Sequence, residues 1–270
     1  DLGGRSNITI ASTSAFSGRV TLGASAYSFR GALVSLIGEL QPTASVTFRR
    51  SGKSDLTLSF KVDGVNHRLI DGQLFDGTQT VGLDAWQNRW SKTTPPLELA
   101  ALQTMVGYYT CQLNPPAPPA EAIPQGNGYA SFSVASTGRL TVSGKLPDGT
   151  SFVAATFVGP LGEVLVYQNI HSRLGSVLGS LDIDSGSDTY TPPYGDNTVM
   201  GTISWSKPAS TSRIYRAGFS DQNFGVQGGR YVAPAKTEVV MGLLDDGATN
   251  NGSLLFDEGG IADTFTAPDI

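Results

Sequence analysis

Apolar and polar residues alternate with a period of two along much of the chain, which is the pattern of half-buried β-strands. Leu56, Leu58 and Phe60 are separated by polar residues, and residues 139–143 and 202–206 repeat the pattern. One face of each such strand is apolar and the other carries hydroxyl groups, as expected for antiparallel sheets with one face in water. Asp-Gly and Asn-Gly pairs follow several of these segments and favour tight hairpin turns. The chain is therefore predicted to be all-β.

A short motif occurs twice, with about half the chain between its copies. Residues 10–14, IASTS, recur as residues 134–138, VASTG. Residues 16–20, FSGRV, recur as residues 142–146, VSGKL. Strand and turn signals come about every ten residues, which is the spacing of a barrel or sandwich. We therefore predict an antiparallel barrel or sandwich that is built from two related halves with little helix.

The boundaries of the two halves follow from this repeat. The halves are predicted to cover residues 1–105 and 106–228, and residues 229–270 are predicted to add closing strands. We expect the three parts to form one compact unit, because closing strands would remove exposed sheet edges. Residues 97–105 follow two prolines and are the best helix candidate. Residues 84–90 are a second candidate, for one or two helical turns.

Charge and composition exclude several classes of protein. The formal net charge is −5 and no run of Lys and Arg occurs, so we predict no nucleic-acid partner. No apolar run approaches the roughly 20 residues of a membrane helix, so we predict no membrane span. Cys111 is the single cysteine, which excludes an internal disulfide, and we expect it to be buried in a strand. Only 15% of the residues are charged and 33 are glycine, which is typical of secreted β-proteins.

Five motifs of the second half combine glycine with aromatic or turn residues. They are Gly107-Tyr108-Tyr109, residues 125–130 (QGNGYA), 144–150 (GKLPDGT) and 201–208 (GTISWSKP), and Gly218-Phe219. Together they resemble an uncharacterised β-rich repeat module of large secreted or surface proteins of environmental bacteria. The resemblance is best over residues 106–220 and weaker in the first half. It implies a β-architecture and a secreted or cell-surface location, and it carries no activity and no catalytic residues.

The sequence contains no recognisable catalytic centre. His67 and His171 are the only histidines, no Gly-x-Ser-x-Gly motif is present, and the two histidines lack metal-ligand spacing. We expect surface or structural roles for both. A pair of carboxylates can hydrolyse a glycosidic bond, but no glutamate lies in a recognisable signature. A polysaccharide-acting hydrolase is therefore kept as the alternative to a non-enzymatic protein.

One acidic segment has the oxygen spacing of a cation-binding loop. Asp182, Asp184 and Asp188 are spaced around Gly186, and Ca²⁺ prefers several carboxylate and carbonyl oxygens on a tight loop. No glutamate follows where a bidentate ligand is expected. The segment is interpreted either as a calcium site or as an acidic loop without metal, and no other cofactor is predicted.

Two aromatic clusters are candidates for carbohydrate binding, because aromatic planes stack on sugar rings and amide groups bond the ring hydroxyls. Trp86 and Trp90 would share one face if their segment were helical, with Asn88 between them. Tyr190 and Tyr194 flank a proline pair in the second cluster. The alternative for the two tryptophans is that they fill the mouth of a barrel or anchor a loop.

These observations favour a non-enzymatic structural or adhesive module of an exported bacterial protein, with glycans or neighbouring domains of a larger surface protein as partners. A hydrolase and a ligand-free spacer repeat are the alternatives. An exposed aromatic row on a sheet face would favour a binding module. Two carboxylates in a cleft would favour a hydrolase. The absence of both features would favour a spacer.

Overall fold

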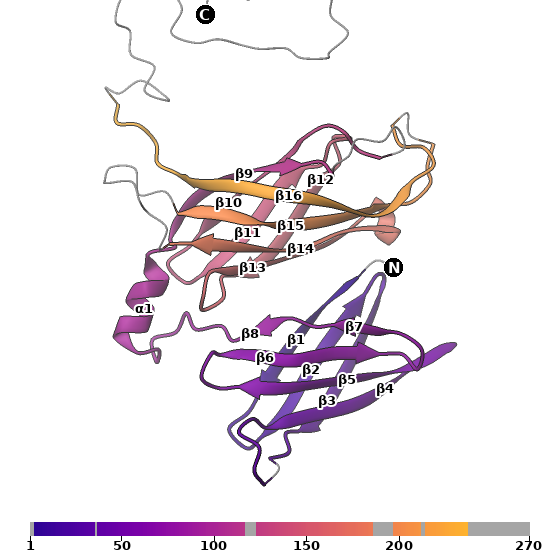
Figure 1. Cartoon of the computed structure of the whole chain (residues 1–270), viewed down its shortest axis with the longest axis vertical. Helices are drawn as coiled ribbons and strands as arrows, with labels where there is room; N and C mark the ends of the chain where they lie inside the picture. The colour runs from indigo at the N-terminus through magenta and orange to yellow at the C-terminus, as the bar shows by residue number, and fades with distance from the viewer. Residues whose placement is uncertain (1–2, 36, 117–122, 186–196, 212–213, 237–270) are drawn as a thin grey trace, which may run out of the picture. The chain divides into compact units, whose positions relative to one another are not determined.

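The strands expected from the alternating pattern are present in the computed structural model (Figure 1), and every pair of neighbouring strands is antiparallel. The structure describes residues 3–35, 37–116, 123–185, 197–211 and 214–236. These residues form sixteen strands, one α-helix and one 3₁₀ helix, so the all-β fold class is confirmed. The described residues up to Tyr231 form one compact unit, and the chain divides from it at Val232.

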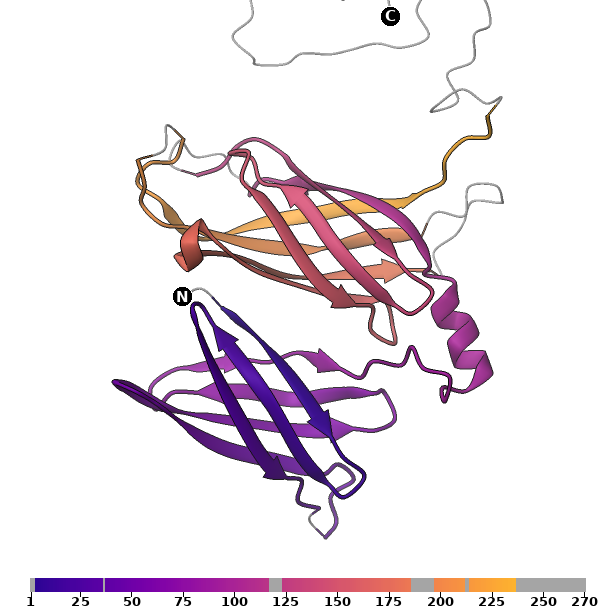
Figure 2. The same cartoon turned by 180° about the vertical axis from the view of Figure 1, so that it is seen from behind.

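The first half (β1–β8) is an up-and-down succession of strands. They are β1 (Gly4–Ile10), β2 (Ala15–Leu22), β3 (Ser25–Ala32), β4 (Thr43–Arg50), β5 (Lys53–Asp63), β6 (Arg68–Phe75), β7 (Thr80–Gly82) and β8 (Ala85–Trp86). β1, β2 and β3 lie side by side in one sheet, drawn in indigo in Figure 2, and β4 to β8 form another. A bridge between Val34 and Thr43 joins the two sheets where the chain passes from β3 to β4.

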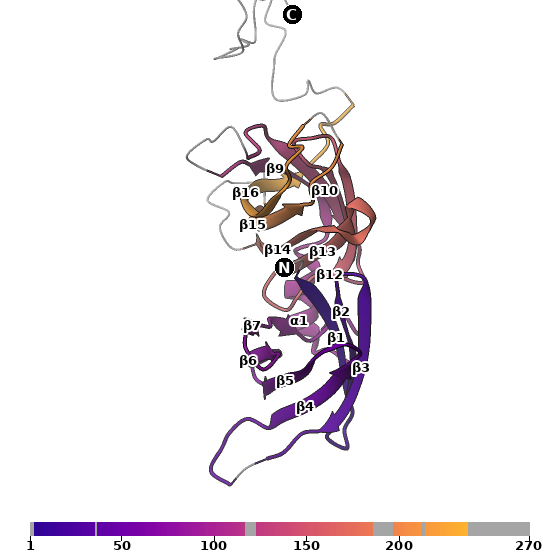
Figure 3. The same cartoon turned by 90° about the vertical axis from the view of Figure 1, so that its right-hand side faces the viewer.

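The second half (β9–β16) is a single eight-stranded sheet in the order β12-β11-β10-β9-β16-β15-β14-β13. Its elements are β9 (Gly107–Asn114), β10 (Gly128–Val134), β11 (Arg139–Lys145), β12 (Ser151–Phe157), β13 (Glu163–Ile170), η1 (His171–Arg173), β14 (Gly175–Asp184), β15 (Thr198–Lys207) and β16 (Phe219–Tyr231). A bridge between Val158 and Val164 links the two end strands, so the sheet curves into a nearly closed barrel (Figure 3).

The predicted closing strands begin inside this barrel. Residues 229–231 are the end of β16 and pair with residues 108–110 of β9. This pairing joins the meander β9–β12 to the meander β13–β16 and completes the order of the sheet. Residues 237–270 lie outside the described part of the chain.

Each half has its own cluster of buried hydrophobic side chains among the described residues. In the first half, Phe16 of β2 packs edge-on against Phe60 of β5, with ring centroids 5.4 Å apart. In the second half, the fully buried Trp205 of β15 contacts the ring of Phe224 of β16. Burying a side chain of this size stabilises the fold by about 1.5–3 kcal/mol. Alternate residues of the longer strands, such as β5 and β10, fill these clusters, so the residues between them face outward.

The repeated motif forms the same hairpin turn in both halves. The amide of Ser14 donates to the carbonyl oxygen of Ala11 at 3.0 Å, and the amide of Gly138 donates to that of Ala135 at 2.8 Å. Ser14 and Gly138 both have positive φ angles, 65° and 70°. The hairpins β1–β2 and β10–β11 are therefore structurally equivalent.

Residues 16–20 do not occupy the same structural positions as residues 142–146, although the two segments have similar sequences. Counted from the shared turn, the buried Phe16 corresponds to the buried Leu140, two residues before the residue that matches it by sequence. The alignment of residues 16–20 with residues 142–146 is therefore wrong as a structural match. The reason is the period of two in a strand, because a shift of two residues keeps the same residues facing inward.

The helix predicted from the two prolines is present as α1 (Pro96–Gln103). The helix proposed for residues 84–90 is wrong. Ala85 and Trp86 form β8 instead, which pairs with Leu69 and Arg68 of β6. Pairing with an existing sheet edge therefore overrides the local helical pattern.

Candidate functional site

Three exposed tyrosines lie on the outer surface of the eight-stranded sheet. Tyr108 of β9, Tyr129 of β10 and Tyr231 of β16 have exposed fractions of 43%, 55% and 46%. Strand alternation directs them outward, because the next residues along β9 and β10 are buried. We call this surface the tyrosine face. It consists of Tyr108, Thr110, Gln112, Tyr129, Ser131, Ser133, Thr141, Ser143, Gln227 and Tyr231.

Aromatic rings stand at two ends of the tyrosine face. Tyr108 is paired with Tyr231 across β9 and β16, and the two rings meet edge to face with centroids 6.1 Å apart. Tyr129 lies opposite Gln112, which is four residues along β9 from Tyr108. At about 3.3 Å per residue of strand, Tyr129 is about 13 Å from the other two rings along the sheet.

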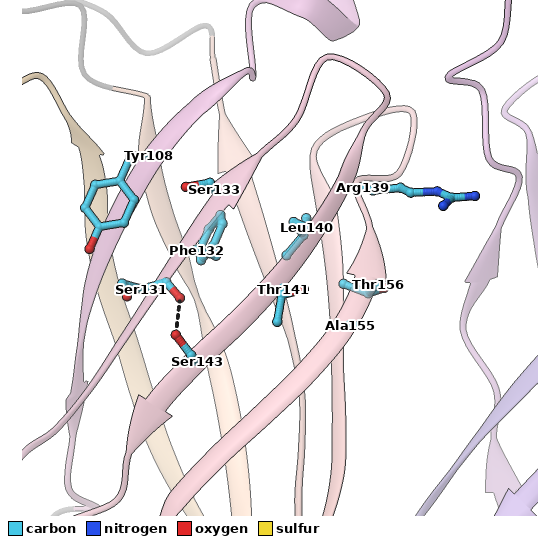
Figure 4. A pocket seen from close by; sticks show the side chains of 10 residues that line it. All are labelled: Tyr108, Ser131, Phe132, Ser133, Arg139, Leu140, Thr141, Ser143, Ala155 and Thr156. Atoms are coloured by element: carbon cyan, nitrogen blue, oxygen red, sulfur yellow. Dashed lines mark hydrogen bonds between the residues drawn. The ribbon is translucent and has the colours of Figure 1, made fainter.

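Hydroxyl groups fill the surface between these rings. Thr110, Ser131 and Ser143 stand opposite one another on β9, β10 and β11. The Ser143 hydroxyl donates to the Ser131 carbonyl oxygen at 3.5 Å, as Figure 4 shows. A hollow beside them is lined by Tyr108 and by these serines, while the Arg139 guanidinium extends away from Tyr108 (Figure 4). The surface therefore presents donors and acceptors between flat apolar rings.

The tyrosine face is held from beneath by a buried aromatic stack. The ring of Tyr109 lies parallel to that of Phe132, with centroids 5.0 Å apart. The Tyr109 hydroxyl donates to the carbonyl oxygen of Met105 at 2.7 Å and accepts from the Asn197 amide at 2.8 Å. Burial raises the pKa of Tyr109, so its hydroxyl stays a neutral donor. These contacts fix the strands that carry the exposed residues.

Cys111 also lies beneath the face, as expected from the sequence. It is buried in β9, and burial raises the pKa of its thiol to about 12. The thiol is therefore protonated near neutral pH and is a core group rather than a nucleophile.

Four of the strands at or next to the tyrosine face carry no carboxylate. The sequences of β9, β10, β11 and β12 contain no Asp and no Glu. General acid–base hydrolysis of a glycoside needs a carboxylate pair. The charged groups at this surface are cations, because Lys145 stands opposite Tyr129 and Arg139 lines the hollow, and the other side chains offer stacking and neutral hydrogen bonds.

The described glutamates are engaged elsewhere or stand apart. Arg89 holds Glu98 with two hydrogen bonds of 2.6 and 2.7 Å, and these hydrogen bonds lower the pKa of Glu98. His67 lies 4.0 Å from the same carboxylate. Glu163 accepts from the Leu161 amide at 2.8 Å. Glu121, Glu238 and Glu258 lie outside the described residues.

The structure places the two tryptophans of the predicted cluster in β8 and in the segment that follows it, where both contact residues 158–159 of the second half. Trp90 is half-buried, donates from Nε1 to the Val158 carbonyl oxygen at 2.8 Å and packs against the core of the second half. Trp86 is half-buried in β8. The Asn88 side chain accepts from the Trp90 amide at 3.0 Å and so closes its own turn. We interpret these residues as anchors of the segment between the halves.

The other predicted site residues lie at or beyond the edge of the described chain. Asp182 and Asp184 are exposed on β14, where Asp182 stands opposite Glu163. Asp188, Tyr190 and Tyr194 lie outside the described residues. Within the described ranges, no group of three or more His, Cys, Asp or Glu side chains is placed to hold a metal ion. The calcium hypothesis therefore stays a prediction for residues 182–188.

A buried ion pair stands at a turn of the second half. Lys207 Nζ lies 2.9 Å from Asp148 Oδ2, and the two side chains are only 4% and 6% exposed. Burial would raise the pKa of Asp148, but hydrogen bonds from Lys207 and Thr150 outweigh it and hold the pKa below its usual range. Burial and the nearby Lys207 lower the pKa of His171. We interpret this group as structural, because it ties the β11–β12 turn to β15.

Sequence reasoning missed the tyrosine face. Its three tyrosines belong to three different strands: Tyr108 to β9, Tyr129 to β10 and Tyr231 to β16. Only the pairing of β9 with β10 and β16 brings them to one surface. The available signal was the strict alternation, which already directs Tyr108 and Tyr129 to the polar side of their strands. The register between strands distant in sequence was not readable.

Comparison with known proteins adds little to this geometry. No protein-family model and no curated protein matches the chain. The chain is similar to the crystal structure of a protein of unknown function from the DUF3598 family of Nostoc punctiforme. The two share 11% sequence identity over 84% of this chain and 88% of that one, with a TM-score of 0.28, which supports no inference about function.

The fold itself defines the class: an all-β protein with a nearly closed antiparallel barrel of eight strands. No helix in the described ranges has the length and apolar character needed to span a membrane.

Proposed function

We propose that the chain is a non-enzymatic adhesive module of an exported bacterial protein and that it binds glycans on the tyrosine face. The observation that carries the proposal is the arrangement of three exposed tyrosines around a row of hydroxyls, on strands β9, β10, β11 and β16. Exposed aromatic groups gathered on one surface are typical of interaction sites.

The chemistry of a sugar fits both components of this surface. The apolar face of a pyranose ring stacks on an aromatic ring, and its hydroxyls exchange hydrogen bonds with serine, threonine and glutamine side chains. Tyr129 is separated from Tyr108 and Tyr231 by about 13 Å of sheet. A ligand that reaches both ends is therefore an oligosaccharide rather than a single sugar.

The two alternatives explain this surface less well. A glycoside hydrolase places two carboxyl groups about 5 to 9.5 Å apart, and the strands β9–β12 supply none. A ligand-free spacer gains nothing from exposing three tyrosines on one surface, because exposed apolar surface forfeits the free energy of burial.

A glycan array followed by calorimetry with an oligosaccharide series tests the proposal. We expect affinity to rise with chain length and to fall about tenfold or more in Tyr108→Ala and in Tyr129→Ala, since each removes a stacking surface. Phe75→Ala is the matched control, because Phe75 is an exposed aromatic residue of β6 in the first half. No binding by the unaltered protein, or equal losses in all three variants, would contradict the proposal.

Repeating the binding measurement with a chelator distinguishes the tyrosine face from the acidic segment 182–188. If binding is lost in chelator but is unchanged in Tyr108→Ala, the ligand is held at the acidic segment 182–188 instead. Insensitivity to chelator together with loss in the tyrosine variants supports the tyrosine face.

A further inference from the structure

A row of three arginines crosses the outer surface of β1, β2 and β3. Arg19 of β2 stands opposite Asn7 of β1 and Ser28 of β3. Arg5 stands opposite Thr21, and Arg30 stands opposite Ser17. Each arginine is therefore one diagonal step from the next, at about 7–8 Å in a β-sheet. The three side chains are exposed and belong to the outward-facing positions of their strands.

Short polar side chains surround the arginines. We call this surface the arginine face, and it consists of Arg5, Asn7, Thr9, Ser17, Arg19, Ser28 and Arg30. A hollow on it is lined by Arg19, Arg30 and the neighbouring hydroxyl and amide groups, together with Phe29 of β3 and with Val46, Thr47 and Phe48 of β4. Guanidinium groups next to hydroxyl donors are well suited to carboxylate and sulfate oxygens.

The arginines lack counter-charges of their own. The strands β1 to β4 contain no Asp and no Glu, although the whole chain has a net charge of −5. Among the described residues, no salt bridge joins Arg5, Arg19 or Arg30 to a carboxylate. The nearby strand β5 carries Asp55, outside this face. Three like charges side by side repel one another, and an anionic ligand relieves that repulsion.

We propose that the arginine face binds a polyanionic glycan, one whose sugars carry carboxylate or sulfate groups. The spacing of the arginines places a positive charge at regular diagonal steps, as a repeating anionic polymer requires. The hydroxyl and amide side chains between them match the uncharged hydroxyls of such a polymer. This proposal stands on the arginine face alone and does not depend on the tyrosine face.

A nucleic acid fits this surface less well. Tight binding to duplex DNA uses about 6–10 phosphate contacts, and the face offers three arginines. Single-stranded nucleic acids are bound by stacking of bases on exposed aromatic rings, and the outward positions of β1, β2 and β3 carry none. The remaining charge of the protein is negative and repels a long phosphate chain.

The test compares dextran sulfate, polygalacturonate, unmodified dextran and a DNA oligonucleotide as probes of the full chain. We expect dextran sulfate or polygalacturonate to bind, unmodified dextran to bind at least tenfold more weakly on this face, and affinity to fall as salt rises from about 50 to 200 mM. The preference between the first two probes distinguishes sulfate from carboxylate recognition.

The decisive variant is Arg19→Ser combined with Arg30→Ala. These replacements are the residue types found at the equivalent positions of the second half, Ser143 and Ala155, so the sheet is expected to tolerate them. We expect at least a tenfold loss of polyanion binding. The control is Arg173→Asn combined with Arg216→Ala, which removes two exposed arginines of the second half and is expected to leave binding within twofold.

Three results would overturn the proposal. They are no polyanion binding by the unaltered protein, equal binding by both double variants, and tighter binding of DNA than of either anionic polysaccharide at the same salt concentration. Circular dichroism of each variant establishes that a loss of binding is not a loss of fold.

Discussion

The arginine face and the tyrosine face lie at equivalent positions of the two halves but carry different chemistry. Asn7 pairs with Arg19 in the first half, and Ser131 pairs with Ser143 at the same distance from the shared turn in the second. Arg19 and Ser143 are therefore equivalent. In the same way, Arg30 of β3 and Ala155 of β12 are equivalent, since each pairs with the corresponding residue of the preceding strand.

The comparison shows which positions of a repeated hairpin are constrained. Phe16 and Leu140 are both buried, because an inward position must be apolar to fill a core. Outward positions pack against nothing and can change charge or size at little cost to stability. The two halves therefore share a turn and a pattern of burial but present unlike surfaces.

The strands next to the two equivalent hairpins make the two faces differ further. β10 has β9 on its other side, which contributes Tyr108 to the tyrosine face. The equivalent strand β1 is an end strand of its sheet in the described part of the chain. The tyrosine face therefore extends over two more strands, β9 and β16, than the hairpin itself provides.

The largest difference in stability is expected at the turns. The β11–β12 turn carries Asp148 in a buried ion pair with Lys207, whereas β2 and β3 are joined by a tight turn between Leu22 and Ser25. Lys207→Ala leaves a buried carboxylate without its partner and is expected to lower the free energy of unfolding by about 3–5 kcal/mol. Urea denaturation measures this value.

The exposed Arg19→Ser is the control and is expected to change the same quantity by less than about 0.5 kcal/mol. A loss below about 1 kcal/mol in Lys207→Ala would mean that the ion pair is not buried in solution.

The next largest effect is expected from exchanging the equivalent turn residues. A Cβ atom at Gly138 would overlap the indole ring of Trp90, whereas Ser14 already has a side chain at the same φ. Gly138→Ser is expected to lower the free energy of unfolding by about 1–3 kcal/mol, and Ser14→Gly to change it by less than about 1 kcal/mol. Thermal and urea unfolding of the two variants give the comparison.

A double variant tests whether the overlap with Trp90 causes the loss of stability in Gly138→Ser. Combining Gly138→Ser with Trp90→Ala removes the ring that the new side chain meets, so the double variant should lose less than the sum of the single losses. Additive losses would show that Trp90 does not pack on this turn.

The third prediction concerns a variant that moves two arginines of the arginine face to the equivalent positions of the second half. Ser143→Arg combined with Ala155→Arg, in a chain that also carries Arg19→Ser and Arg30→Ala, places two arginines at the equivalent positions of the second half. We expect dextran sulfate binding to recover by roughly tenfold, because charge-assisted hydrogen bonds contribute about 1.5–3 kcal/mol each. Calorimetry measures the recovery, and no gain would show that arginines alone do not make the site.

The smallest expected effect is the response of the second half to acid. The pKa of His171 is lowered in the folded state, so the unfolded chain takes up a proton first as the pH falls through about 6.5. The stability of the folded state therefore decreases with falling pH. The lowered pKa of Asp148 acts with the same sign at lower pH, where protonation removes its charge from the ion pair with Lys207.

His171→Asn tests this assignment, because asparagine tolerates the positive φ of 49° at this position. Between about pH 7.5 and 5, the variant should lose less stability than the unaltered protein, as urea midpoints will show. An unchanged pH dependence would assign the effect to other groups.

Much of the fold could be predicted from the sequence, because strand alternation depends on residues that are close together in the chain. The alternation around Leu58 depends on neighbouring residues and was predicted correctly. Residues 134–138 were recognised from the sequence as a repeated motif, and the structure showed that this motif forms a turn. The helix after the proline pair was also predicted correctly. The helix over residues 84–90 was not, because the chain there pairs with β6, a contact that local patterns do not encode.

The sequence by itself determined that the protein is all-β, that a short motif is repeated, and which residues of the alternating strands face outward. The tertiary structure decided which outward residues meet. Arg5, Arg19 and Arg30 form no run in the sequence, and Tyr108 and Tyr231 stand in strands from opposite ends of the barrel sequence. The physical reason is that alternation assigns a residue to a face, whereas hydrogen-bond register between strands assigns its neighbours.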